Sequence, residues 1–245
     1  MLLKRIARSV VPALLLLATG AVQADETSVK NAFVAKFPKA TVESVRKLPD
    51  LDLYEIVVPR GDEPIIIYTD EGFRFMMQGS LVETKGMVDL TEKTRNKLTA
   101  IDFDSLPLGS AIKKVKGNGS RKIAVFSDPD CPFCKRVEQE FEKMNDVTVY
   151  ILLYPIEQLH PKAPERSRAI WCSGNRLKAW DDYMLKGVAP TAKSDCTNPV
   201  ADIVEFGKKR GVTGTPTLVF QDGSRIPGAL TAAQIESQLQ GASSK

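Results

Sequence analysis

The stretch SDPDCPFCKR, residues 127–136, decides how this chain folds. It follows an apolar run at residues 123–126, which predicts a buried strand, and it precedes a segment with helical spacing of apolar residues at 137–144. Two cysteines therefore lie where a strand gives way to a helix. Cys131 falls at the start of the helix and Cys134 three residues later, so the two sulfur atoms can come within disulfide distance.

The predicted position of Cys131 favours its thiolate. Unpaired backbone N–H groups and the positive end of the helix dipole stabilise an anion at a helix N-terminus. Because the thiolate is the form that attacks, we expect Cys131 to be the nucleophile and Cys134 the resolving thiol. Pro132 fits the first helical turn, where it loses no hydrogen bond. Acidic residues before the cysteines oppose the thiolate and basic residues after them favour it, so the sign of their net effect stays open.

Half of a zinc site is the alternative interpretation of a Cys-X-X-Cys pair. Zinc would need two further ligands at similar spacing, whereas Cys172, Cys196 and His160 are far apart in sequence. We therefore expect a redox pair, with no metal and no cofactor. His160 could also act as a general base, but its place before Pro161 in a predicted turn favours a solvent-exposed residue.

The first 24 residues have the pattern of a secretory signal. Basic residues open it, an apolar core covers residues 10–18, and small residues at 21–24 predict cleavage after Ala24. A membrane anchor is the alternative, but the apolar run is shorter than the roughly 20 residues of a spanning helix. We therefore expect an exported protein in an oxidising compartment, where cysteines commonly pair.

The length and net charge of the chain limit the number of domains and the kinds of partner that we expect. The 245-residue chain has room for one large domain or two small ones. Its formal net charge of +4 is too small to make nucleic acid an expected partner. A basic cluster at residues 113–116 is expected to lie on a solvated face.

Residues 25–85 predict a small α+β domain, an antiparallel sheet with one helix. Ser28 is a candidate helix cap and Pro38 a stop. We expect strands at residues 41–47, 53–58, 65–69, 73–77 and 80–84. A domain of this size buries little surface alone. Self-association through an edge strand and a monomeric sheet covered by its own helix both stay open.

A polar helix with Thr91 as candidate cap predicts a solvent-exposed linker over residues 86–104. Residues 105–245 then predict an α/β domain. Its cysteine-bearing helix lies between two buried strands, the second at 147–153, in a right-handed βαβ unit. Inserted helices follow, and a hairpin opened by Thr215-Pro216 leads to a last helix capped by Thr231.

This order of elements resembles the thioredoxin fold. Proteins with that fold carry a cis proline beside the two cysteines, and Thr215-Pro216 matches its position. The resemblance implies that an extended substrate segment pairs with the backbone at Thr215 and Pro216, next to Pro132 and Phe133. Thioredoxins also keep a buried acid six residues before the first cysteine. In this chain Val125 occupies that position and cannot accept a proton. We therefore expect water or another group to accept the proton of the resolving thiol.

The whole chain resembles the DsbC/DsbG family of periplasmic thiol:disulfide interchange proteins. It shares the secretory signal, the small N-terminal domain, the linker helix and the segment at residues 160–180. The resemblance implies a periplasmic protein disulfide isomerase and reductase, dimeric through its N-terminal domain. It also implies misfolded disulfide-containing exported proteins as substrates, and a membrane thiol reductase of the DsbD type that keeps the active-site thiols reduced.

Two features leave the balance of activities open. The dipeptide Pro132-Phe133, between the two cysteines of the motif, resembles the corresponding dipeptide of DsbG. A second cysteine pair is instead a feature of DsbC. A DsbG-like reductase and chaperone, or a disulfide-donating oxidase, are therefore the alternative functions. Cys172 and Cys196 could be inert buried thiols. The even cysteine count, the oxidising compartment and the family resemblance favour a structural disulfide between them.

Overall fold

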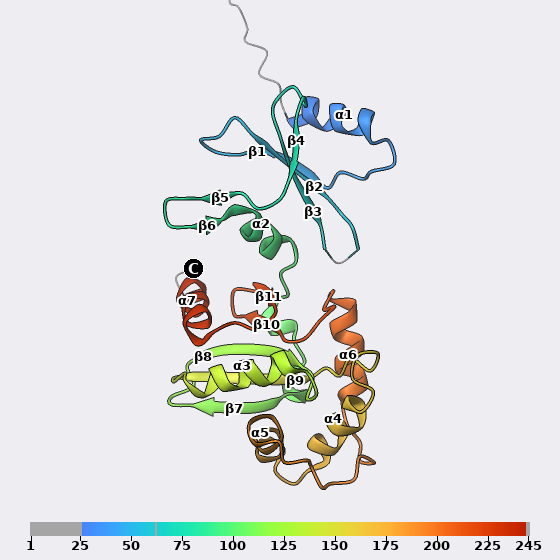
Figure 1. Cartoon of the computed structure of the whole chain (residues 1–245), viewed down its shortest axis with the longest axis vertical. Coiled ribbons are helices and arrows are strands. Elements are labelled where there is room, and N and C mark those ends of the chain that lie inside the picture. The colour runs from blue at the N-terminus through green and yellow to red at the C-terminus, as the bar shows by residue number, and fades with distance from the viewer. Residues whose placement is uncertain (1–25, 62, 244–245) are drawn as a thin grey trace, which may run out of the picture.

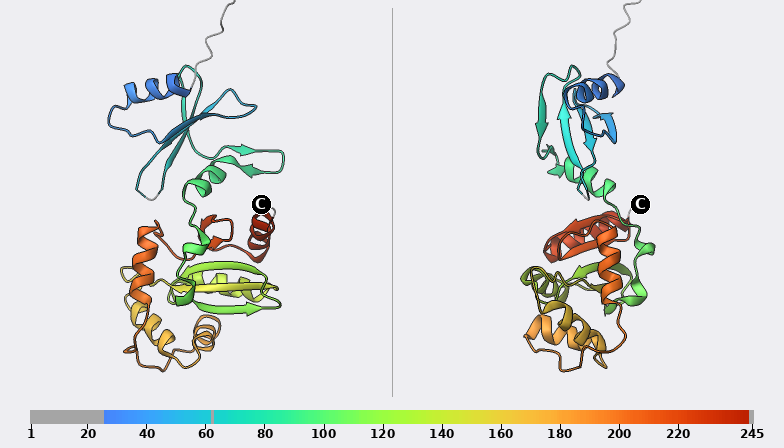
Figure 2. Two further views of the ribbon diagram at one scale, coloured as in Figure 1. Left: turned by 180° about the vertical axis from the view of Figure 1, so that it is seen from behind. Right: turned by 90° about the vertical axis from the view of Figure 1, so that its right-hand side faces the viewer.

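The computed structural model describes residues 26–61 and 63–243, so the predicted signal lies outside the described residues. Two parts of the chain lie end to end, with helix α2 (Leu90–Leu98) between them (Figures 1 and 2). Within the described residues, no helix has the length and apolar character needed to cross a bilayer.

The N-terminal part is a helix on an antiparallel sheet, as the sequence predicts, and this sheet has four strands. Helix α1 (Glu26–Lys36) contributes buried Val29 and Phe33 to the core of the sheet. The strands pair in the order β1-β2-β3-β4, with bounds Ser44–Lys47, Tyr54–Val58, Ile65–Thr69 and Met76–Gln78. Ser28 lies inside α1, so its predicted role as helix cap is wrong.

The strand expected at residues 80–84 does not join this sheet. Only Val82–Glu83 (β5) is extended, and it pairs with Val88–Asp89 (β6) in a separate hairpin. The reason is Thr91, whose hydroxyl accepts a hydrogen bond from Leu81 N–H at 2.8 Å and contacts Tyr68 Oη at 2.7 Å. Thr91 is therefore a buried residue that links Leu81 to Tyr68, and it is not the cap of α2. Asp89 caps that helix instead.

The C-terminal part contains a five-stranded sheet in the order β11-β10-β8-β9-β7. These strands have the bounds Arg225–Pro227, Thr217–Phe220, Arg121–Ser127, Val147–Leu153 and Ile112–Lys116. Strands β8 and β9 are parallel, and helix α3 (Pro132–Glu142) connects them. The predicted βαβ unit and the α/β class of this domain are confirmed.

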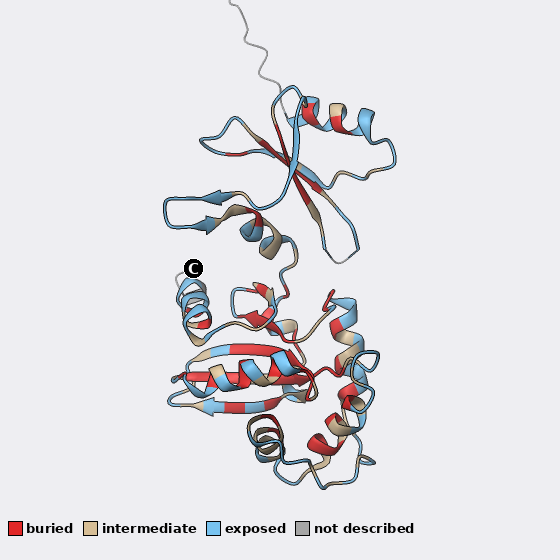
Figure 3. Ribbon diagram, in the orientation of Figure 1, coloured by how far each residue is buried: buried red, intermediate tan, exposed pale blue. Residues whose placement is uncertain are grey.

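Side chains of the central strands alternate between two cores, because successive residues of a strand point to opposite faces. Ile123 and Val125 of β8 join a core with α3, α5 (Arg176–Lys186) and α7 (Ala232–Ser243). Ala124 and Phe126 join a second core with α6 (Val200–Lys209). Buried residues accordingly cover β8 and β9 (Figure 3). Helix α4 covers Ala163–Cys172.

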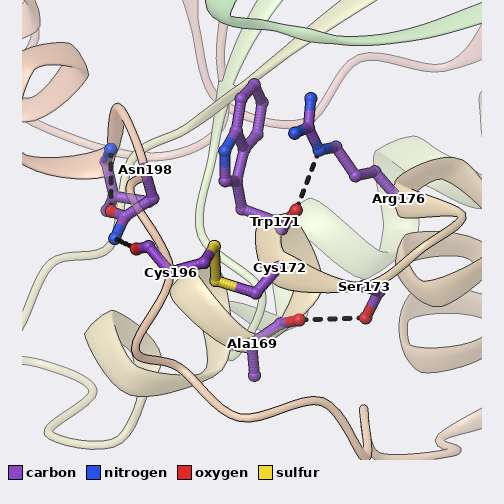
Figure 4. The surroundings of a disulfide bond; sticks show 8 residues. Ala169, Trp171, Cys172, Ser173, Arg176, Cys196 and Asn198 are labelled. Atoms are coloured by element: carbon purple, nitrogen blue, oxygen red, sulfur yellow. Dashed lines mark hydrogen bonds between the residues drawn. A yellow bond between two sulfur atoms is a disulfide. The ribbon is translucent and has the colours of Figure 1, made fainter.

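A disulfide joins Cys172 at the end of α4 to Cys196 in the loop before α6 (Figure 4). Nearby, the Arg176 guanidinium lies 3.7 Å from the ring centroid of Trp171, and Asn198 Nδ2 donates to the Cys196 carbonyl oxygen at 2.8 Å. The two cysteines are 24 residues apart in sequence. In the chain-entropy treatment, closing a loop of this size stabilises the fold by about 3 kcal/mol.

The basic cluster at 113–116 does not form a solvated face, because it forms strand β7 and its side chains alternate. Lys114 is buried and its Nζ lies 2.8 Å from Glu138 and 2.7 Å from Asp181. Burial disfavours its charge, but attraction to the Glu138 carboxylate and a hydrogen bond to Asp181 outweigh this and raise the pKa of Lys114. Only alternate members of the cluster, Lys113 and Val115, are exposed.

Lys114→Met is expected to destabilise the C-terminal part by about 3–5 kcal/mol, because Glu138 would stay buried without its cation. The measurement is urea unfolding followed by the fluorescence of the two tryptophans, both of which lie in this part. Lys113→Met is the matched control, because its side chain is exposed on the same strand. Its effect should stay within about 0.5 kcal/mol. Equal losses in both variants would contradict the assignment.

Candidate active site

The two cysteines lie where the sequence predicts, at the junction of β8 and α3. Cys131 is the N-cap residue of α3, and Pro132 is its first helical residue. Both cysteines are free thiols, with 4% of Cys131 and 1% of Cys134 exposed. The loop before them is turned back on itself, since Cys131 N–H donates to the Asp128 carbonyl oxygen at 3.2 Å. The Cys131 side chain is therefore nearly covered and that of Cys134 fully covered.

The surroundings of the two sulfurs give the two thiols different pKa values. A hydrogen bond from the Cys134 thiol lowers the pKa of Cys131 to about 5, against the opposing effect of burial. The backbone N–H groups of Cys134 and Phe133 act in the same direction. Burial raises the pKa of Cys134 itself. At neutral pH the arrangement is therefore a thiolate at Cys131 beside a protonated Cys134.

The loop before β10 also contributes to the site, although it is distant from the two cysteines in sequence. The Thr215–Pro216 peptide bond is cis, and the Thr215 carbonyl oxygen lies 3.4 Å from Cys131 Sγ. This loop is held by two hydrogen bonds: Gly228 N–H donates to the Pro216 carbonyl oxygen at 2.8 Å, and Thr217 Oγ1 donates to the Gly214 carbonyl oxygen, also at 2.8 Å. The backbone of this loop is therefore held directly against the Cys131 sulfur.

Pro132 and Phe133 form the exposed rim of the site. Both are exposed in the first turn of α3, and 49% of Phe133 is accessible. The Arg136 guanidinium lies 4.6 Å from the Phe133 ring centroid. An exposed aromatic ring two residues from Cys131 offers apolar contact to a polypeptide that approaches the two thiols.

Asp128 has a structural role at the site that the sequence interpretation missed. Its buried carboxylate accepts hydrogen bonds from Asp130 N–H at 2.8 Å and from Ile156 N–H at 2.7 Å. Its own N–H donates to Cys134 Sγ at 3.4 Å. An aspartate that bonds to the backbone two residues later is a common turn device, so the segment Asp128-Pro129-Asp130 did carry a signal.

His160 is not the solvent-exposed turn residue that the sequence interpretation favoured. Its side chain is partly buried, and its Nδ1 lies 3.0 Å from Asp128 Oδ2. The histidine therefore helps to hold the loop that carries the cysteines. Asp130, the other acid of this loop, was also missed as a contact residue: it pairs with Arg166 and Tyr183.

No group of three or more His, Cys, Asp or Glu side chains suited to hold a metal ion occurs within residues 26–61 and 63–243. The chemistry that the described arrangement can support is that of the two thiols: nucleophilic attack by Cys131 and release by Cys134.

Two family models match this chain, one in the N-terminal part and one in the C-terminal part. Residues 20–92 match the family described as the disulfide bond isomerase protein N-terminal domain. Residues 108–243 match the family described as a thioredoxin-like domain. The predicted resemblance to the thioredoxin fold is confirmed.

Individual relatives extend this match over most of the chain. The probable thiol:disulfide interchange protein DsbC of Bordetella parapertussis is 38% identical over 217 residues, which are 89% of this chain and 74% of the relative. DsbC of Escherichia coli K12 is 27% identical over 86% of this chain and 85% of its own. The crystal structure of a disulfide interchange protein from Neisseria gonorrhoeae matches with a TM-score of 0.54 and 50% identity. That match covers 56% of this chain and 98% of the other. The chain therefore belongs to the DsbC family of thiol:disulfide interchange proteins.

Proposed function

We propose that this protein is a disulfide isomerase and reductase that acts on non-native disulfides of exported proteins, with Cys131 as nucleophile and Cys134 as resolving thiol. The observation that carries the proposal is the geometry at the start of α3. There the Cys131 sulfur lies at the helix N-terminus, within reach of the Cys134 thiol and next to the cis-proline loop. Membership of the DsbC family supports the same activity.

The reaction begins when the Cys131 thiolate attacks one sulfur of a substrate disulfide. A mixed disulfide forms and one substrate thiolate is released. If a different substrate thiolate then attacks the mixed disulfide, a new substrate disulfide forms and Cys131 returns as a thiolate, with no net oxidation or reduction. If Cys134 loses its proton and attacks instead, the substrate leaves with two thiols and the protein becomes oxidised. A stable Cys131 thiolate is a good leaving group, which favours release by either route.

The rim of the site is proposed as the substrate contact surface. An extended segment of the substrate pairs with the backbone at Thr215 and Pro216, as a strand adds to a sheet edge. Pro132 and Phe133 contact the side chains of that segment. This assignment is supported by the 3.4 Å separation of the Thr215 carbonyl oxygen from Cys131 Sγ and by the exposure of the Phe133 ring.

The working place of the protein is proposed to be the periplasm, after removal of the signal at Ala24. The oxidised form left by the second route must be reduced before it can isomerise again, since isomerisation begins with a thiolate. We assign this step to a membrane thiol reductase of the DsbD type, following the family resemblance. It supplies two electrons and regenerates both thiols.

The N-terminal domain, residues 25–85, is proposed to join two copies of the chain, with residues 86–104 as linker and residues 105–245 as catalytic domain. Large apolar side chains are exposed on and around β4 and the β5–β6 hairpin: Phe75, Met76, Met77, Val82, Met87 and Val88. Phe75 is 70% and Met87 74% exposed, which is costly unless another surface covers them. Strand β4 also ends its sheet, so its outer edge can pair with a second copy.

Cys131→Ser is expected to abolish the recovery of scrambled ribonuclease, because the attacking sulfur is lost. Cys134→Ser is expected to keep the attack but not the intramolecular release, and so to accumulate mixed disulfides with substrates. The measurements are ribonuclease activity after incubation with each variant, and non-reducing gels that reveal the covalent complexes.

The alternative functions give different outcomes in the same experiments. A chaperone without thiol chemistry would suppress aggregation unchanged in Cys131→Ser, and isomerisation would be absent from the wild type as well. A disulfide donor would be found oxidised when cellular thiols are trapped with a maleimide, whereas the proposed isomerase would be found reduced. Normal maturation of scrambled ribonuclease with Cys131→Ser would contradict the proposal.

The reactivity of Cys131 with iodoacetamide is expected to rise with pH and to be half-maximal near pH 5, the lowered pKa of its thiol. Because this pKa is below the 9.0 of an ordinary cysteine, the Cys131 thiol contributes stability to the folded reduced state, and this contribution is fully present above about pH 9 and is lost as pH falls toward 5. Stopped-flow alkylation and urea unfolding across this range measure the two effects. A midpoint near 9 would contradict the assignment of the nucleophile.

Phe75→Asp with Met77→Asp is expected to convert a dimer into monomers, because charges would replace apolar contacts at the β4 edge. Sedimentation velocity measures the change, and alkylation of Cys131 should stay at the wild-type rate because the site lies in the other part of the chain. Val188→Asp is the control, since this apolar residue is 55% exposed but lies in the C-terminal part. A monomeric wild type at micromolar concentration would contradict the assembly.

A further inference from the structure

Asp130, the residue before Cys131, and three other side chains form a cluster. We call it the Asp130 cluster, and its members are Asp130, Lys135, Arg166 and Tyr183. Asp130 Oδ1 forms an ion pair with Arg166 and accepts a hydrogen bond from Tyr183 Oη at 2.7 Å. The Lys135 ammonium lies 4.9 Å and the Arg166 guanidinium 4.7 Å from the centroid of the Tyr183 ring.

The members of the cluster come from three helices and the active-site loop. Lys135 belongs to α3, Arg166 to α4 and Tyr183 to α5. Helices α4 and α5 are inserted between the strands β9 and β10 of the sheet. One residue from each of the inserted helices α4 and α5 therefore contacts the carboxylate of Asp130, in the loop before Cys131.

A carboxylate next to Cys131 in sequence should oppose the formation of a thiolate, because two negative charges repel one another. The side chain of Asp130 is only 15% exposed and that of Arg166 only 24%, so water and salt screen the pair incompletely. The cations and the hydroxyl of the cluster compensate for the charge of Asp130. Burial and the hydrogen bond to Asp130 raise the pKa of Tyr183 to about 12, so its hydroxyl stays a donor at neutral pH.

We propose that Arg166 and Tyr183 are positioning residues for the exchange reaction: they hold and neutralise the Asp130 carboxylate so that the neighbouring Cys131 can react as a thiolate. The inference rests on the proposed function of Cys131. In a merely structural role, the ion pair would join the loop to the helix and would not change the reactivity of the Cys131 sulfur.

The test is the pH dependence of Cys131 alkylation in the reduced full-length protein. Arg166→Gln is expected to move the midpoint upward by about 0.5–1 pH unit, a three- to tenfold change in proton concentration, because Asp130 loses its cation. Tyr183→Phe should shift it less in the same direction, and Arg166→Lys should restore most of the wild-type value. Arg168→Gln is the matched control, because Arg168 is on the same helix but lines a cavity with Tyr154 and Val204.

A double-mutant cycle separates an effect through Asp130 from a direct effect of the arginine charge. In Asp130→Asn protein the carboxylate is gone, so adding Arg166→Gln should leave the midpoint unchanged. An equal upward shift with and without the carboxylate would overturn the inference. Thermal unfolding monitors the fold of each variant. Should Arg166→Gln not fold, Tyr183→Phe and Arg166→Lys still decide the question.

Failure of this inference and failure of the proposed function give different results. If wild-type Cys131 titrates near its lowered pKa but no variant of the cluster moves the midpoint, only the positioning role is wrong. If wild-type Cys131 titrates as an ordinary thiol, the nucleophile itself is wrongly assigned.

Discussion

The structure depends on one constraint: a sulfur anion must be stabilised at the first turn of α3. Backbone N–H groups of that turn and the Cys134 thiol favour the negative charge, and a side-chain hydrogen bond of Thr215, in a loop 84 residues later, acts in the same direction. Neither the helix nor the cis-proline loop would create this environment alone. The five-stranded sheet keeps them together, since β8 leads into α3 and the antiparallel neighbour β10 follows the loop.

The inserted helices connect the edge of the sheet to the active site. On α5, Asp181 contacts buried Lys114 of the edge strand β7, and two residues later Tyr183 contacts Asp130 in the active-site loop. The disulfide between Cys172 and Cys196 joins the end of the preceding helix to the chain that leads into α6. The insertion is thus fixed covalently at one place and by charged side chains at two others. A rigid support of this kind keeps a reactive loop in one geometry.

The two parts of the chain differ in how much apolar surface they bury. The C-terminal sheet has two buried cores and carries the thiol pair, whereas the N-terminal sheet is small and leaves apolar side chains of β4 and its neighbours exposed. A small domain buries too little surface to be very stable alone, so contact with another surface is a physical advantage. That argument supports the proposed assembly, while both thiols of the proposed reaction lie in the C-terminal part.

Sequence alone determined what local patterns control. Periodicity and β-branched runs predicted β2, β3, β8 and β9, and the cysteine-proline start predicted α3 with both thiols in place, because these signals act over a few residues. Only the tertiary structure decided the burial of Lys114, the contact of His160 with Asp128, and the separation of β5 from the first sheet. Each depends on a partner far along the chain: 24 residues for Lys114 with Glu138, 32 for Asp128 with His160, and 23 for Tyr68 with Thr91. A polar side chain shows its role only when folding supplies such a partner, since the same residue type is solvated without one and buried with it.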